Sequence, residues 1–274
     1  MKYSLVIKGP DVTNGPLALI SGTFEERLKK AKSLGYDGIE LMVVDPLNID
    51  WSWLKNSINS SGLGISQIVT GELFGSEGLC LVNNDRDLRQ RTQKRVESVI
   101  DMAAYLNAMV NIGRLRGRLE FLDDKENALS LAHKYLHPTF KYALERNVKI
   151  TIEPLNRYET DFICCADEAI RFIKESGFEN IGIMLDTFHM NIEETTFKDG
   201  LQTAGDRLWH VHIADSNRKF PGSGHINFEP IFSTLNEMGY EAYISAELLP
   251  LPDPDSAARE TINFLKKQKF FVAS

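Results

Sequence analysis

The sequence contains little cysteine and no long apolar run. Its three cysteines, Cys80, Cys164 and Cys165, are odd in number, and adjacent cysteines do not easily bridge to each other. This pattern argues against a disulfide-stapled protein. No run approaches the length of a membrane span, and Pro10 and Asp11 fall where a signal peptide would still need its apolar segment. We therefore expect reduced thiols and a cytoplasmic protein without a membrane partner.

The sequence also lacks an excess of positive charge. Its formal net charge is −7 and its pI is near 5.5, whereas broad binding of nucleic acid requires clustered lysine and arginine to neutralise phosphates. No G-x-G-x-x-G follows the first strand-like run, so the usual evidence for a dinucleotide cofactor is missing. We expect neither a nucleic-acid partner nor a dinucleotide.

What the sequence does contain is an alternation of short apolar runs and helical patterns from end to end. Helical signals include a capping box at Thr23 and Glu26 and a last periodic segment over residues 256–268. Parallel strands need helical crossovers, and this length with 43% hydrophobic residues suits one large core. We predict a single-domain (β/α)8 TIM barrel over residues 1–274. The eight predicted strands are YSLVIKG, GIELMVV, ISQIVTG, MVNIG, VKITIEP, IGIMLD, LWHVHIAD and YISAEL.

Four residues with metal-binding side chains stand at the downstream ends of the last four runs. They are Glu153, Asp186, His212 and Glu247. Because the carboxyl ends of barrel strands converge on one face, we expect these side chains to share one coordination sphere. Three carboxylates and an imidazole favour a catalytic divalent ion, Mn²⁺ first, with Mg²⁺ or Co²⁺ as alternatives. We expect His210 to point to the side of its strand opposite His212, so that only His212 faces the barrel interior.

At these residues the chain resembles a known group of proteins. The segments ITIEPLNRYET, GIMLDTFHMNIEE, HVHIADSNRKFPGSGHINF and SAELL resemble the xylose-isomerase-like sugar epimerase/isomerase superfamily, most closely ketose 3-epimerases of the D-tagatose and D-psicose (allulose) type. The resemblance is strongest from Thr151 to Leu249. It implies a sugar substrate, a homodimer or homotetramer, and the four metal ligands above. It further implies an acid/base pair, Glu153 and Glu247, and substrate-contacting residues Glu159, His189 and Arg218.

The chemistry of the acid/base pair can also be argued from the residues. A proton next to a ketone is too weakly acidic for an unaided carboxylate, but a divalent cation on the neighbouring oxygens stabilises the enediolate that forms. Epimerisation removes a proton on one face and returns one on the other. Glu153 and Glu247 arrive from different strands, so they are suited to these two roles.

An arginine-rich segment, NIGRLRGRLE, departs from the free-ketose epimerases, which tend to carry aromatic and apolar residues there. Arg114 and Arg116 alternate along it, so they could face the active site together and bind a phosphate or carboxylate. In the alternative interpretation they are solvated charges paired with Glu120 and Asp123. The two interpretations predict different substrates.

Two further residues have open roles. Glu40, at the end of GIEL, points toward the expected barrel mouth, where a core hydrogen bond and a catalytic role are both possible. His225 in GSGHINF lies in a loop whose glycines permit a close approach to a ligand.

The predicted function is a metal-dependent ketose 3-epimerase. The same constellation also supports a sugar-phosphate epimerase, an aldose–ketose or hydroxypyruvate isomerase, and an inosose dehydratase, since all pass through an enediolate or enolate. Two alternatives come from other classes. An apurinic-endonuclease-type phosphodiesterase would need more metal-binding histidines and a basic face. The six histidines and the net charge of −7 count against it. A sugar-binding barrel would bind without turnover.

Overall fold

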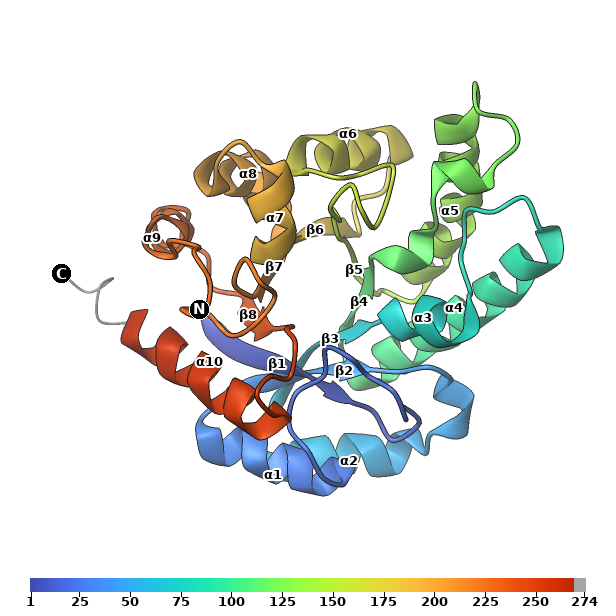
Figure 1. The fold of residues 1–274 in the computed structure, drawn as a ribbon. Coiled ribbons are helices and arrows are strands. Elements are labelled where there is room, and N and C mark those ends of the chain that lie inside the picture. Colours follow the sequence, from blue (N-terminus) through green and yellow to red (C-terminus); the bar gives the residue numbers. More distant parts are fainter. Residues whose placement is uncertain (269–274) are drawn as a thin grey trace.

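The computed structural model describes residues 1–268. In this range, eight parallel strands close into a barrel in which each strand pairs with the next and β8 pairs with β1. A ring of helices surrounds the strands (Figure 1). The strands are β1 (Lys2–Lys8), β2 (Gly38–Met42), β3 (Gly64–Val69), β4 (Met109–Ile112), β5 (Ile150–Ile152), β6 (Ile181–Asp186), β7 (Leu208–Ile213) and β8 (Tyr243–Ala246). The predicted TIM barrel and its eight strands are confirmed.

Helices connect the strands and cover the outside of the barrel. The α-helices are α1 (Phe24–Leu34), α2 (Trp51–Ser61), α3 (Gly71–Glu77), α4 (Arg86–Leu106), α5 (Ala128–Glu145), α6 (Ala166–Ser176), α7 (Thr187–Glu193), α8 (Phe197–Ala204), α9 (Glu229–Glu237) and α10 (Pro254–Gln268). Short 3-10 helices lie in the loops: η1 (Pro46–Asn48), η2 (Arg114–Arg116), η3 (Leu119–Phe121) and η4 (Gly205–Arg207). No helix within residues 1–268 is long and apolar enough to cross a membrane.

Local signals fix the ends of the first helix. The Thr23 side chain accepts from the backbone N–H of Glu26, and the Glu26 carboxylate accepts from the backbone N–H of Thr23. This is the predicted capping box, and it satisfies N–H groups that the helix itself leaves without a partner. At the other end, Gly35 adopts the left-handed conformation with φ 90°, and its backbone N–H donates to the carbonyl oxygens of Ala31 and Lys32 in the last turn of the helix.

The strands are buried on both faces because helices pack outside them and side chains fill the barrel. In β2 and β6 every residue is buried, which explains why parallel strands appear as continuous apolar runs in the sequence. The carboxyl ends of β5 to β8 meet at one end of the barrel, where the predicted site lies.

Candidate metal centre and active site

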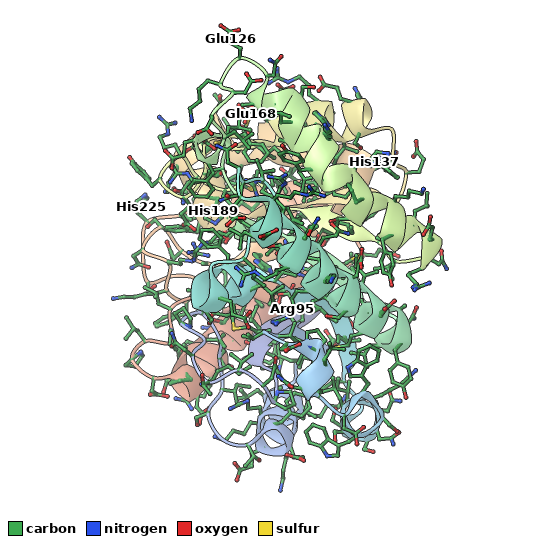
Figure 2. All side chains as sticks on the ribbon, turned by 90° about the vertical axis from the view of Figure 1, so that its right-hand side faces the viewer. Arg95, Glu126, His137, Glu168, His189 and His225 are labelled. Atoms are coloured by element: carbon green, nitrogen blue, oxygen red, sulfur yellow. The ribbon has the colours of Figure 1, made fainter. Side chains whose placement is uncertain are left out.

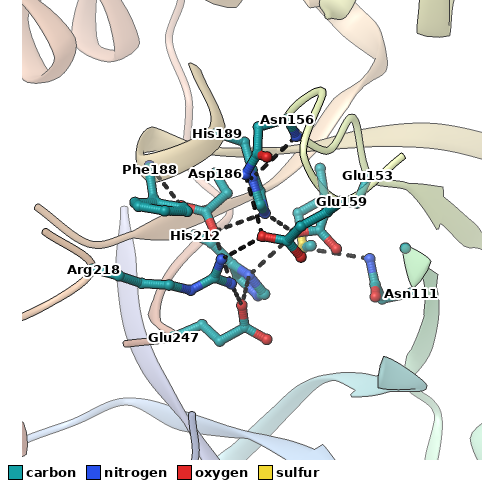
Figure 3. A network of polar contacts seen from close by, with 12 residues as sticks. Asn111, Glu153, Asn156, Glu159, Asp186, Phe188, His189, His212, Arg218 and Glu247 are labelled. Atoms are coloured by element: carbon teal, nitrogen blue, oxygen red, sulfur yellow. Dashed lines mark hydrogen bonds and ion pairs between the residues drawn. The ribbon is translucent and has the colours of Figure 1, made fainter. Parts of the chain in front are cut away.

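The four predicted ligands converge at the carboxyl end of the barrel. Glu153 directly follows β5, Asp186 ends β6, His212 lies in β7, and Glu247 directly follows β8. One ligand atom from each lies within 4.8 Å of the others. Figure 3 shows these side chains pointing toward one another from four different strands. The barrel geometry therefore brings together residues that are far apart in the sequence.

Two buried atoms in this cluster have no hydrogen-bond partner among the described residues. Asp186 uses Oδ1 to accept from the N–H of Phe188 and so caps α7, but its Oδ2 is left without a partner. The Nδ1 atom of His212 is likewise without one. Buried polar atoms are rarely left unsatisfied in proteins. An oxygen-rich set with free lone pairs fits a divalent cation, which these four residues would hold.

The electrostatics of the cluster also favour a cation. Burial and the neighbouring Glu247 raise the pKa of Glu153, and burial raises the pKa of Asp186 to about 6. Burial also acts on Glu247, but His212 and Arg218 outweigh it and lower the pKa of that carboxyl. Three carboxylates thus share the positive charge of two side chains, His212 and Arg218. A bound divalent ion would supply the further positive charge that would balance them.

The expectation that His210 and His212 point to opposite sides of their strand was wrong. Residues two apart on a strand share a face, and both imidazoles point into the barrel toward Glu40. The Nε2 atom of His212 lies 2.8 Å from Glu40 Oε2, and that of His210 lies 3.0 Å from Glu40 Oε1. All three side chains are fully buried. His212 alone also reaches the carboxylate cluster, through Nδ1 at 3.5 Å from Glu247.

Arg218 connects the cluster to the surrounding loops. Its guanidinium donates to Glu247 Oε2 at 2.9 Å, lies 3.7 Å from Asp186 Oδ2, and contacts Glu159 Oε1 at 3.4 Å. The backbone of Arg218 has φ 57°, an uncommon conformation that aims the side chain inward from the loop after β7. The guanidinium also lies over the aromatic ring of Phe188, with its central carbon 4.7 Å from the ring centroid.

His189 lies beside the ligands on α7. Its Nε2 atom is 3.8 Å from Asp186 Oδ2 and 3.9 Å from Glu153 Oε1. This nitrogen has no hydrogen-bond partner in the described chain. Its Nδ1 atom lies 2.7 Å from the side-chain amide of Asn156. Burial and the neighbouring Arg218 keep the pKa of His189 well below its usual range, so the imidazole is neutral. Sequence reasoning missed Asn156, for which only its place in the NRYET turn was a signal.

The site opens into a cavity of ≈ 510 Å³, a volume typical of small-molecule sites. The predicted substrate-contacting residues Glu159, His189 and Arg218 line it, together with Glu153 and Glu247. The lining of the cavity also includes polar and aromatic residues that sequence reasoning did not select. Among them are Asn111, Glu72, Phe74, Arg118, Phe121 and Tyr158.

The predicted pairing of Arg114 with Arg116 at the active site is not what the structure shows. Arg116 is fully buried, and its guanidinium donates to four backbone carbonyls, those of Gly113, Glu153, Phe162 and Ile163. It stabilises the framework behind the site and does not line the cavity. A guanidinium has five donors in a fixed plane, which suits this role.

Arg114 remains at the cavity, exposed, with its guanidinium carbon 5.0 Å from the centroid of the Phe74 ring. The alternative pairing with Glu120 and Asp123 is also not observed within residues 1–268, where Glu120 pairs with Arg118 at 2.9 Å. The cationic side chains facing the cavity from this loop are therefore Arg114 and Arg118.

His225 lies outside this cavity. It is exposed, at the edge of the molecule in Figure 2, whereas His189 lies farther in. Its Nδ1 atom is 2.9 Å from the hydroxyl of Ser216, so it belongs to the hydrogen bonding of its own loop.

The candidate metal-ligand cluster lies at the carboxyl end of a closed eight-stranded barrel, which is the usual position of the active site in TIM-barrel enzymes. A comparison with known proteins also indicates a TIM-barrel protein. Residues 28–268 match the family described as xylose isomerase-like TIM barrel, and the chain belongs to that family.

Relatives within the family are named as carbohydrate epimerases. The chain is 36% identical over 224 residues to a D-psicose 3-epimerase of Ruminiclostridium cellulolyticum, covering 80% of this chain and 76% of the relative. It is 28% identical over 256 residues to a 3-dehydro-D-guloside 4-epimerase of Escherichia coli, covering 88% and 93%. The solved D-psicose 3-epimerase of Clostridium cellulolyticum superposes with a TM-score of 0.80 at 23% identity, covering 99% of both chains. The chain is an enzyme of this carbohydrate-modifying group.

Proposed function

We propose that the protein is a metal-dependent ketose 3-epimerase that removes and returns a proton at C3 through an enediolate. The observation that carries the proposal is the placement of two carboxylates around one imidazole: Glu153 lies 3.9 Å and Glu247 3.5 Å from His212 Nδ1. They come from β5 and β8, which are not neighbours in the barrel. Two carboxylates that approach from different sides suit proton transfer on opposite faces of one carbon.

The surroundings of the two carboxylates differ in a way that suits these roles. Arg218 donates to Glu247 at 2.9 Å and helps to keep the pKa of Glu247 low, so this carboxylate is suited to accept the C3 proton. In the cation-free protein, burial and Glu247 raise the pKa of Glu153, so of these two carboxyls Glu153 holds a proton more readily, which suits it to return a proton to the opposite face. A divalent cation at the ligand cluster would stabilise negative charge on the substrate oxygens.

The substrate would lie in the cavity that Glu159, His189 and Arg218 line. His189 is neutral and its Nε2 atom has no partner in the described chain, so it is available to bond a substrate oxygen. Mn²⁺ as the ion and a dimer or tetramer as the assembly remain predictions from the sequence.

The test is turnover of free ketoses in D₂O by protein loaded with Mn²⁺. A 3-epimerase places deuterium at C3 of the product and leaves C1 unlabelled, whereas an aldose–ketose isomerase exchanges at C1 or C2. Chelation should abolish the reaction, and added Mn²⁺ or Co²⁺ should restore it. Label only at C1, or full activity in verified metal-free protein, would reject the proposal.

A sugar-phosphate epimerase is the second candidate, supported by Arg114 and Arg118 at the same cavity. The same screen should include phosphorylated ketoses. Higher kcat/KM for these would favour the second candidate, because guanidinium groups bind phosphate strongly.

A further inference from the structure

We infer that Glu40 is a positioning residue of the candidate metal centre. Its carboxylate accepts a hydrogen bond from the Nε2–H group of His212, which leaves the Nδ1 lone pair of that imidazole directed at the acidic ligands. The inference concerns the metal site itself and does not depend on which sugar, if any, the protein converts.

The contact that carries the inference is short, buried and made across the barrel. Glu40 Oε2 and His212 Nε2 are 2.8 Å apart, and both side chains are fully buried. Glu40 lies in β2 and His212 in β7, two strands that are not paired with each other in the closed barrel. The carboxylate therefore reaches His212 through the barrel interior, behind the ligand cluster.

The two nitrogens of His212 have different surroundings. Nε2 faces the Glu40 carboxylate, while Nδ1 has no hydrogen-bond partner among residues 1–268 and lies 3.5 Å from Glu247 Oε2 and 3.9 Å from Glu153 Oε1. An imidazole that binds a cation must offer a lone pair on one nitrogen and carry its proton on the other.

Glu40 decides which nitrogen keeps the proton. With the proton on Nε2, the imidazole donates to the carboxylate and Nδ1 is free to bind the cation. With the proton on Nδ1, two acceptors would face each other at 2.8 Å inside the barrel, and the protonated nitrogen would point at the cation site. Carboxylate–histidine–metal arrangements fix ligand orientation in this way.

His210 lies beside the other oxygen of this carboxylate. Its Nε2 atom lies 3.0 Å from Glu40 Oε1, on the same face of β7 as His212. Both oxygens of the Glu40 carboxylate thus face an imidazole nitrogen, Oε1 facing His210 and Oε2 facing His212. A carboxylate offers an acceptor on each oxygen, whereas the amide of glutamine has a donor in place of one of them.

The test is binding of Mn²⁺ to chelator-stripped protein, measured by isothermal titration calorimetry. Glu40→Gln keeps the shape and removes the charge, and it should raise the Kd for Mn²⁺ by about 10–100-fold, the effect expected for loss of a carboxylate behind a ligand histidine. Glu40→Asp keeps the charge and should lose less. The matched control is Thr151→Val, because Thr151 is also fully buried in the barrel and its hydroxyl donates to Gln67 at 2.9 Å and not to Glu40. The control should bind Mn²⁺ like the wild type.

A second measurement keeps the inference testable if Glu40→Gln does not fold. Protein labelled with ¹⁵N-histidine and loaded with diamagnetic Zn²⁺ as a stand-in should show His212 protonated at Nε2 and coordinated through Nδ1. A proton on Nδ1, or wild-type Mn²⁺ affinity in folded Glu40→Gln, would overturn the inference. Mn²⁺ binding that depends on Glu40 without turnover of any ketose would reject the proposed function alone.

Discussion

A methyl group added at Gly113 should displace the carboxylate of Glu153. Gly113 follows β4, and a Cβ atom built there would lie 2.4 Å from Glu153 Oε2 and 3.5 Å from Glu153 Cδ. Ordinary contacts lie near 3.5 Å, so the oxygen must retreat by roughly 1 Å. A misplacement of this size at a reacting group can cost about 10²-fold in rate. Gly113→Ala should therefore lower kcat by about 10²-fold.

The assay compares kcat at saturating Mn²⁺, the Kd for Mn²⁺ and urea unfolding. We expect a large loss of kcat and a weaker Kd with only a modest change in the free energy of unfolding, because the end of one side chain moves and the barrel does not. Gly71→Ala is the control: Gly71 begins α3, and an added Cβ meets no atom within 4 Å. It should unfold and bind Mn²⁺ like the wild type.

The outcome that would refute the reasoning is specific. If Gly113→Ala keeps kcat and the Kd for Mn²⁺ within about twofold of the wild type, the Glu153 carboxylate does not work where the structure places it. If instead the variant unfolds at much lower urea, the added methyl group acts on the backbone framework and not on the carboxylate.

Three further predictions concern other groups. Arg116→Met should lower the free energy of unfolding by about 3–5 kcal/mol in urea, since it leaves four carbonyls without their buried donor; a loss under 1 kcal/mol would contradict this. Arg114→Ala should raise KM for phosphorylated ketoses far more than for free ketoses, because the exposed guanidinium is in no ion pair within residues 1–268; equal changes would exclude a phosphate contact. Burial, with Glu168 adding to it, raises the pKa of Cys164 to about 11, and burial also raises the pKa of Cys80 and Cys165. The native thiols should therefore react slowly with a disulfide reagent at pH 8 and faster as pH rises, as thiolate forms; rapid reaction at pH 7 would argue against the burial of these thiols.

The strands and the ligand cluster were accessible from the sequence because they follow a simple physical rule. Strands covered by helices outside and by packed side chains inside must be apolar on both faces, and the segment IGIMLD coincides with β6 (Ile181–Asp186) for this reason. A polar side chain at the end of such an apolar run is therefore easily recognised in the sequence. Once a closed barrel is predicted, the four ends must meet, so Glu153 and Glu247 come together without any knowledge of the loops.

Other parts of the site depend on contacts that no local pattern reveals. Arg116 alternates with Arg114 as a substrate-facing pair would, but it turns inward to carbonyls as far away as Ile163. Asn156 beside His189 is positioned in the same way by the fold of a loop. His210 is a different case, because the two-residue period of a strand already places His210 and His212 on one face. The expectation of opposite faces misapplied that period, and both imidazoles lie beside Glu40.

The candidate metal ligands and the substrate-facing residues lie on different parts of the chain. The four candidate metal ligands lie on or directly after β5, β6, β7 and β8, and barrel closure fixes them relative to one another. Glu159, Arg114 and Arg218, by contrast, lie in the loops after β5, β4 and β7, where changes of sequence and length leave the barrel intact. A cation held by the strands would supply the same proton chemistry with many substrates, because stabilising an enediolate requires only two neighbouring oxygens and a base. If the proposed function holds, the strand ends set the reaction class and the three loops set the choice of sugar. Substitutions that change specificity without loss of metal binding should then be found in these loops.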